Sequence, residues 1–204
     1  MMIAIIDYGV GNLQSVMNAF EKVGAKAVLE IDPDKLKDYK KAILPGVGAF
    51  GDAMEHLHVK GMDEAIICFA SSGKPLMGIC LGMQLLFEKS QEFGESKGLG
   101  LIQGEVVSFD TSRFVEPLKV PHMGWNTLNI KKQNALVKDL PEAVYLYFVH
   151  SFHAVAKPEF IIGTTHYGYE FTSAVQKENI YGFQPHPEKS HEHGLRIYKN
   201  FTEL

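Results

Sequence analysis

The chain has only two cysteines, a single tryptophan and no long hydrophobic run. Cys68 and Cys80 are too few for a disulfide framework, so we expect a reducing compartment, the cytoplasm. The longest stretch without a charged residue, 143–156, is too short to cross a bilayer. A formal net charge of -4 gives no electrostatic reason to expect nucleic acid or an anionic membrane as a partner.

Short apolar runs and helical patterns alternate along the first half of the chain. Residues 2–6 form a continuous apolar run that is typical of a strand buried on both faces, and residues 13–23 have helical spacing after Asn12, a good helix cap. Further strands are expected at 26–31, 41–44 and 75–79, with helices at 49–71, interrupted at Gly61, and at 81–90. Strands separated by helices predict crossover connections and therefore a parallel sheet.

The second half of the chain is richer in β-forming residues. Connections between its apolar runs are mostly too short for crossovers, so some of these strands should pair antiparallel. We expect strands at 106–109, 127–130, 144–149, 152–156, 160–165 and 171–175, and a last helix at 192–201. The prediction is one α/β domain, residues 1–204, with a mostly parallel central sheet flanked by helices and antiparallel strands added in the second half.

The segment Gly78-Ile79-Cys80-Leu81-Gly82 carries the strongest chemical signal. An apolar strand runs into a helix, and Cys80 stands at the turn with a glycine two residues to either side, as in a nucleophile elbow. Free N–H groups and the dipole at a helix start favour the thiolate, the reactive form of cysteine. Cys80 is therefore a candidate nucleophile, whereas Cys68, within an apolar segment, fits a small buried hydrophobe.

A candidate base lies far along the chain, in Gln184-Pro185-His186-Pro187-Glu188. Residues i and i+2 of an extended segment point to the same side, so Glu188 could orient the imidazole of His186 toward the thiol. The neighbouring prolines should hold this segment extended until Lys189. A solvated surface pair is the alternative. A metal site made of His186, Glu188, His191 and His193 is less favoured, because one cysteine and no tight ligand pair accompany them.

The loop Pro45-Gly46-Val47-Gly48 follows one predicted strand and precedes a helix. Its glycines would let backbone N–H groups approach a ligand closely, which would suit an oxyanion hole; a plain turn is the alternative.

Together these motifs resemble the class I (triad) glutamine amidotransferases, and most closely the HisH family, the glutaminase subunit of imidazole glycerol phosphate synthase. The resemblance runs nearly end to end, and the segment Pro121-His122-Met123-Gly124-Trp125-Asn126 together with Lys189 carries the family assignment. The other matching segments are 7–13, 44–50, 78–87, 149–151 and 186–190.

The resemblance implies a catalytic triad of Cys80, His186 and Glu188 that hydrolyses glutamine to glutamate and ammonia through a thioester, with no cofactor and no metal. It implies backbone N–H groups of Val47 and Leu81 as the oxyanion hole. The amino-acid end of glutamine would be held by Gly48, Gln84, Glu92 and Ser151. Two positions depart from the family pattern: Phe152 replaces a tyrosine, and Pro185 replaces an aromatic residue before the triad histidine.

The resemblance also implies a partner, a (β/α)₈-barrel cyclase subunit that forms a heterodimer with this chain and receives the ammonia through a tunnel. It makes imidazole glycerol phosphate and an aminoimidazole carboxamide ribotide in histidine biosynthesis. From the residues alone, Trp125 could be a core or an interface residue; the resemblance favours the interface, with Asn12 and Met123 nearby.

Three alternatives stay open at this point. The same glutaminase chemistry could supply ammonia to a different synthase, for instance one that aminates a surface sugar. The chain could instead be a cysteine hydrolase for another substrate, or a catalytically inactive binding subunit.

Overall fold

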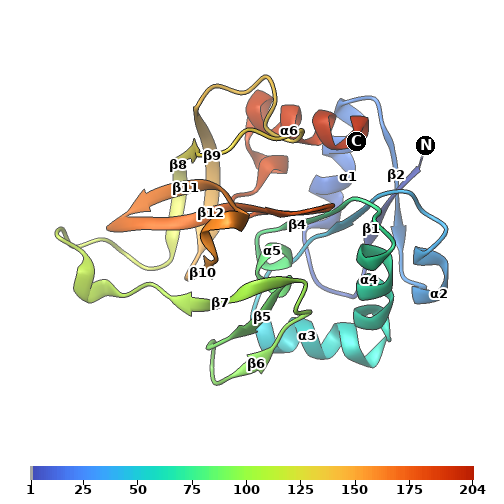
Figure 1. Ribbon diagram of the computed structural model, residues 1–204, viewed down its shortest axis with the longest axis horizontal. Helices are drawn as coiled ribbons and strands as arrows, with labels where there is room; N and C mark the ends of the chain where they lie inside the picture. Colours follow the sequence, from blue (N-terminus) through green and yellow to red (C-terminus); the bar gives the residue numbers. More distant parts are fainter. Residues whose placement is uncertain (1) are drawn as a thin grey trace.

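The computed structural model describes residues 2–204, and its central feature is a sheet of parallel strands (Figure 1). The order is β2-β1-β3-β4-β13, and every neighbouring pair in this set is parallel. The bounds are β1 Met2–Ile6, β2 Lys26–Glu30, β3 Ala42–Leu44, β4 Leu76–Ile79 and β13 Ile180–Phe183. The parallel arrangement predicted for the first half is therefore confirmed, and β13 joins it from the other end of the chain.

Helices cover both faces of this sheet because its strands are apolar on both sides. Along β1, Ile3 and Ile5 face α1 (Leu13–Lys22) and α6 (His191–Glu203), whereas Ala4 and Ile6 face α3 (Phe50–Val59) and α4 (Met62–Ser71). Figure 1 shows these two helix pairs on opposite sides of the central strands. Gly61, with φ of 67°, separates α3 from α4 as expected. Two short helices, α2 (Pro33–Leu36) and α5 (Leu81–Leu85), complete the set.

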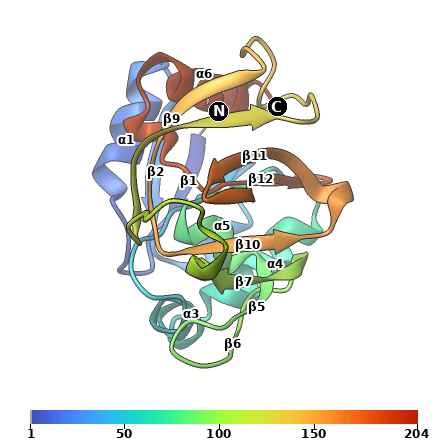
Figure 2. The same cartoon turned by 90° about the vertical axis from the view of Figure 1, so that its left-hand side faces the viewer.

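The remaining strands extend the sheet beyond β13, mostly by antiparallel pairing. Figure 2 shows β8 and β9 beside α6, at the top of that view. The bounds are β5 Phe87–Ser90, β6 Ser96–Lys97, β7 Ile102–Ser108, β8 His122–Ile130, β9 Ala143–His150, β10 Phe152–Ala156, β11 Ile161–Tyr167 and β12 Tyr169–Lys177. Three single 3₁₀ turns lie at Thr111–Arg113, Pro158–Phe160 and Pro187–Lys189.

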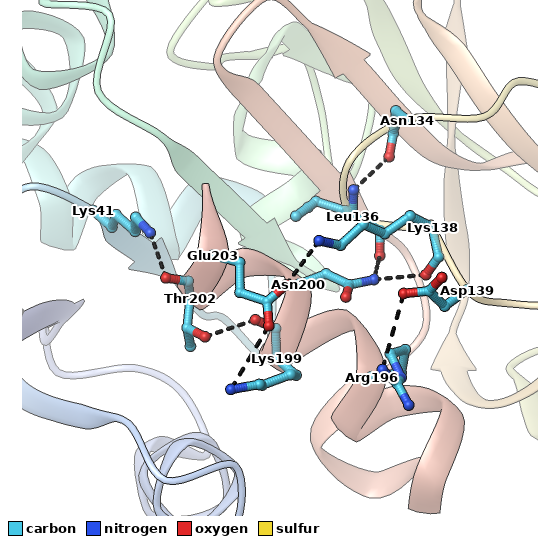
Figure 3. A network of polar contacts seen from close by, with 10 residues as sticks. All are labelled: Lys41, Asn134, Leu136, Lys138, Asp139, Arg196, Lys199, Asn200, Thr202 and Glu203. Carbon is cyan, nitrogen blue, oxygen red and sulfur yellow. Dashed lines mark hydrogen bonds and ion pairs between the residues drawn. The ribbon is translucent and has the colours of Figure 1, made fainter.

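The C-terminal helix is tied to the sheet by polar contacts (Figure 3). Asn200, which is buried, donates to the backbone carbonyls of Leu136 and Lys138, each at 2.9 Å. Lys41 Nζ, at the start of β3, donates to the Thr202 carbonyl at 2.7 Å. These bonds tie α6 to the connection between β8 and β9 and to the residue before β3.

Two sequence-based expectations are wrong. The helix predicted at 81–90 ends at Leu85, because the chain turns there into β5, which pairs with β7 and β6. Cys68, expected as a buried hydrophobe, is exposed on α4, whose buried positions are Met62, Ile66, Phe69 and Ala70. Within residues 2–204, no helix combines the length and apolar character that a membrane span requires.

Candidate active site

Cys80 lies in a sharp turn between β4 and α5, with φ of 54° and ψ of -111°. A side chain at Gly78 would place its Cβ 2.6 Å from the Gly82 carbonyl oxygen, and one at Gly82 would collide with the Leu44 carbonyl. The flanking glycines are therefore required by close backbone approach within the turn and to β3. The turn leaves the N–H groups of the first turn of α5 without partners inside the helix.

Cys80 and His186 reach the same cavity because they leave the same end of two neighbouring parallel strands. In the β4–β13 pair Ile79 lies opposite Phe183, and the Cys80 N–H donates to the Phe183 carbonyl at 2.8 Å. The residues that follow, at 80 and from 184 onward, therefore emerge side by side. The 100 or so intervening residues cross the sheet and return, so the proximity comes from topology and not from sequence spacing.

Glu188 holds the imidazole of His186 from behind. Its Oε1 lies 2.7 Å from Nδ1, and both side chains are 2% exposed. We expected an extended segment here, and that expectation is wrong. Pro187–Lys189 form a 3₁₀ turn instead. A tight turn also brings a carboxylate at i+2 back to the ring at i, and proline is well suited to its first position.

The backbone of His186 is anchored to strand β9. Its N–H donates to the Tyr147 carbonyl at 2.8 Å, and its own carbonyl accepts the Ser190 hydroxyl at 2.6 Å. Ser190 Oγ in turn accepts the Tyr147 N–H at 2.9 Å. These three bonds restrict the position of the ring more tightly than the proline-flanked sequence alone would.

Cys80 and the free edge of the imidazole line one cavity of about 310 Å³. His186 Nε2 is buried and has no hydrogen-bond partner within the chain. Burial alone would lower the pKa of His186, but the Glu188 hydrogen bond and the charges of Cys80 and Glu188 outweigh it and raise the pKa well above the usual value of a histidine. The arrangement thus favours the protonated, imidazolium form of His186.

The same cavity gathers the other predicted site residues. Its lining includes the predicted oxyanion-hole positions and the predicted glutamine-binding positions, namely Val47, Gly48, Leu81, Gln84, Glu92 and Ser151. Gly48 has φ of 98° and open space where a Cβ would lie, so its backbone borders the cavity directly. Of the predicted catalytic and substrate residues, only Glu188 is not in the lining, since it stands behind the His186 ring.

Glu92 is half-buried, and its Oε2 accepts the N–H of Phe50 at 2.8 Å. Phe50 is the first residue of α3, a helix whose own cap residue, Ala49, has no side-chain hydrogen bond. Glu92 therefore caps α3 from outside the helix, which fixes one carboxylate oxygen at the cavity wall.

Gln184 is a site residue that the sequence analysis did not identify. Its side chain is fully buried, with Nε2 3.8 Å from Cys80 Sγ and Oε1 accepting from Gln84 Nε2 at 2.9 Å. Gln84 Nε2 also donates to the Phe152 carbonyl at 2.9 Å. Its position directly after a buried strand could have identified it as a site residue, but that strand, β13, was not predicted.

The two departures from the family pattern lie at the cavity and next to it. Phe152 is half-buried in the lining, where its backbone carbonyl is the polar group that other residues contact. Pro185 is buried beside His186, whose N–H still reaches the Tyr147 carbonyl.

The predicted interface residues are exposed. Met123 is 62% and Trp125 41% exposed, so the core alternative for Trp125 is excluded, and its ring stacks on His191 at 4.9 Å. Asn12 is exposed and caps α1 by accepting the Ser15 N–H. Within residues 2–204, no cluster of three or more potential ligands could hold a metal ion.

Comparisons with known proteins identify the family and the fold. The family model described as glutamine amidotransferase class-I matches residues 4–204. The solved structure of PurLQS from Thermotoga maritima superposes with a TM-score of 0.77 at 21% identity, covering 99% of this chain and 97% of that one. The α/β fold is therefore that of this class of protein.

Curated relatives are much closer in sequence. The imidazole glycerol phosphate synthase subunit HisH of Sulfurimonas denitrificans is 64% identical over 99% of this chain and 98% of its own length. The protein of the same name from Wolinella succinogenes is 61% identical over the whole of both chains. The chain belongs to the class I glutamine amidotransferases and, within them, to the HisH family.

Proposed function

We propose that this chain is the glutaminase subunit of an imidazole glycerol phosphate synthase, with Cys80 as nucleophile, His186 as acid and base, and Glu188 as the residue that orients the imidazole. Full-length identity of 61–64% to curated HisH proteins supports the histidine pathway over the surface-sugar alternative. The observation that supports the chemistry best is the buried His186–Glu188 pair, in which His186 lines the same cavity as Cys80 and has no other partner at Nε2.

The chemistry proceeds in two halves. The Cys80 thiolate attacks the side-chain carbonyl carbon of glutamine, and the His186 imidazolium gives its Nε2 proton to the departing nitrogen, so that ammonia leaves and a γ-glutamyl thioester remains. The neutral imidazole then takes a proton from water, whose oxygen attacks the thioester and releases glutamate and the thiolate. Glu188 accepts the Nδ1–H throughout, which keeps Nε2 facing the reacting atoms.

The cavity walls supply the other contacts that this reaction needs. Backbone N–H groups of Val47 and Leu81 would stabilise the tetrahedral oxyanion. Glu92, Gln84, Ser151 and the Gly48 backbone surround the rest of the cavity and would hold the amino-acid end of glutamine. A volume of about 310 Å³ is at the lower end of the range for small-ligand sites, which suits an amino acid.

The ammonia would be used by a second subunit. The relatives are named as subunits of a synthase, which supports a partner cyclase. A (β/α)₈-barrel cyclase would receive ammonia through a tunnel, and the exposed Met123, Trp125 and Asn12 would belong to the contact surface. Both cysteines are free thiols, as expected for work in a reducing cytoplasm.

The test is glutamine hydrolysis by the chain with its cyclase subunit and the cyclase's nucleotide ligand added. Cys80→Ala should lower the rate by about 10⁴-fold or more while far-UV circular dichroism stays unchanged, because triad losses are of this size. Cys68→Ala, which removes the exposed thiol of α4, is the matched control and should retain full activity. Substantial glutamine hydrolysis by Cys80→Ala would refute the proposal.

A further inference from the structure

Three hydrogen bonds in series connect strand β8 to the cavity wall. Asn126 Nδ2 lies 3.1 Å from His122 Nε2, His122 Nδ1 lies 3.0 Å from His150 Nε2, and His150 Nδ1 lies 2.8 Å from the Phe152 carbonyl. The register of the antiparallel β8–β9 pair places His122 directly opposite His150. The series therefore links two strands to the segment 150–152, all three residues of which line the cavity.

The direction of every bond in this series is determined by its two ends. The Phe152 carbonyl can only accept, so His150 carries its proton on Nδ1 and accepts at Nε2. His122 must then donate from Nδ1 and accept at Nε2, where Asn126 supplies an N–H. The Asn126 amide nitrogen also donates to the His166 carbonyl at 3.0 Å, which independently identifies this atom as a donor.

Both imidazoles are neutral within a closely packed aromatic environment. The His122 ring stacks against Phe148 at 4.9 Å and Tyr167 at 4.1 Å, and the side chains of His122 and His150 are buried. Burial lowers the pKa of His122 to about 4. Burial also lowers the pKa of His150, to about 3, with a smaller opposite effect from its bond to the Phe152 carbonyl and small lowering effects from neighbouring histidines. Neutral rings leave each histidine with one donor and one acceptor, which matches the bonds observed.

The series ends on an atom that glutamine binding would depend on. The Phe152 carbonyl accepts both from His150 Nδ1 and from Gln84 Nε2, and Gln84 Nε2 also donates to Gln184 Oε1. Both hydrogens of the Gln84 amide are then used, and its Oε1 is the polar atom left for a ligand. Ser151 lies between the two bonded residues and lines the same cavity.

We propose that His122 and His150 are positioning residues for the substrate: as a neutral, one-directional pair they fix the Phe152 carbonyl, and through it Ser151 and the Gln84 amide, in the geometry that binds glutamine. The inference rests on the proposed glutaminase function. It assigns a purpose to the histidine of the Pro121-His122-Met123 segment and to the one that precedes Ser151, neither of which takes part in the chemistry.

The first measurement reads the proton positions in the full wild-type chain and needs no activity. Long-range ¹H–¹⁵N correlation spectra at neutral pH distinguish the two nitrogens of each imidazole. Both His122 and His150 should be protonated at Nδ1 and unprotonated at Nε2. A proton on Nε2 of either ring would overturn the proposal.

The second measurement is the glutamine dependence of hydrolysis with the cyclase subunit present. His122→Phe keeps the ring stacked between Phe148 and Tyr167 but removes the donor to His150; the KM for glutamine should rise about tenfold, with kcat within about twofold, because one buried hydrogen bond is lost. His122→Asn places an amide N–H where Nδ1 stood, so most of the affinity for glutamine should return.

His153→Phe is the control for loss of a buried histidine from the same aromatic cluster. His153 contacts the Ala154 carbonyl and the Tyr169 hydroxyl and is outside the series, so this variant should keep the wild-type KM. An unchanged KM in His122→Phe, or an equal rise in His153→Phe, would overturn the inference. If His122→Phe does not fold, the proton positions in the wild-type chain decide. Absence of hydrolysis in the wild type would instead refute the proposed function and leave the tautomer result standing.

Discussion

Gln184 shows how much of the site depends on a single buried amide. Its Oε1 accepts from Gln84 and its Nε2 points at Cys80 Sγ, so one side chain joins the substrate wall to the nucleophile. A contact of 3.8 Å is weak for a neutral thiol, but a donor aimed at a thiolate in a buried site gains strength from the charge. We therefore assign Gln184 a share in stabilising the reactive form of Cys80.

Gln184→Leu should slow the alkylation of Cys80 by iodoacetamide at pH 7 by about tenfold, because the thiolate loses a charge-assisted donor. Cys68 is exposed and would react too, so every protein in the series carries Cys68→Ser. Gln176→Leu, on β12 and bonded only to the nearby Glu178 carbonyl, is the matched control and should alkylate at the parental rate. Equal rates for the two leucine variants would remove Gln184 from the site.

At the scale of elements, the turn between β4 and α5 and the loop after β3 form one packed unit. Gly82 lies against the Leu44 and Pro45 backbone, and Gly46 lies against Leu81 and the Tyr8 hydroxyl. The Tyr8 hydroxyl is buried and donates to the Pro45 carbonyl at 2.9 Å. The distance between the two predicted oxyanion-hole segments is thus set by backbone contact, which only glycine allows.

Gly82→Ala should separate these two segments, because its Cβ would collide with the Leu44 carbonyl, a backbone atom that cannot rotate away. We expect the free energy of unfolding, measured by urea denaturation, to fall by about 1–3 kcal/mol. Glutamine hydrolysis, measured with the cyclase subunit present, should fall by about 100-fold.

Gly51→Ala provides the comparison for this variant. Its Cβ would meet only the Ser96 hydroxyl at 3.1 Å, the end of a side chain that can rotate. Gly51 lies in helix α3, so alanine should be neutral or slightly stabilising there. Wild-type stability and activity in Gly82→Ala would show that the two segments can move apart freely.

Elements with a strong local pattern could be predicted from the sequence. The N-terminal strand, helix α1 with its Asn12 cap, and the break at Gly61 all have signals within a few residues. Strand β8 was predicted only from residue 127, although it begins at His122, because the apolar residues of its first half, Met123 and Trp125, are out of phase with Leu128 and Ile130.

The elements that failed depend on distant partners. Phe87–Ser90 continues an amphipathic pattern, and only its pairing with Ile102–Ser108 makes it a strand. Ile180–Phe183 is short and contains a glycine, yet it is central because β4 and β12 flank it. Motif chemistry was enough to select Cys80, His186 and Glu188 as candidates, and the structure brings them to one cavity. The contacts of Gln184, His122 and His150 exist only once these strands are paired.

For the whole molecule, sequence and fold diverge at very different rates. At 21% identity the PurLQS structure still superposes over 99% of this chain, which shows that the sheet with helices on both faces is retained when most side chains differ. The requirement is for apolar residues on both faces of the parallel strands, and many sequences satisfy it. Buried polar groups are less easily replaced than apolar residues, and those that titrate make the stability of the chain depend on pH.

The buried histidines predict that this chain loses stability on mild acidification. Burial lowers the pKa values of His122, His150 and His153, those of the first two to about 4 and about 3, whereas an unfolded histidine titrates near 6.5. As pH falls below about 6.5 the unfolded chain binds protons that the folded chain does not, so stability is lost. Each such histidine contributes up to about 1.4 kcal/mol per pH unit.

Urea denaturation followed by circular dichroism between pH 6.5 and 4.5 would measure this slope, above the range in which carboxylates with lowered pKa values, such as Glu170, begin to contribute. His153→Phe should flatten the slope, because one neutral buried imidazole is gone. His58 has the opposite sign: a hydrogen bond and charge from Asp63 raise its pKa, so its contribution is complete below pH 6.5 and is lost only as pH rises. His58→Asn should therefore leave the acid slope unchanged, and a wild-type stability that is flat across this interval would mean that the three imidazoles are not neutral in the folded chain.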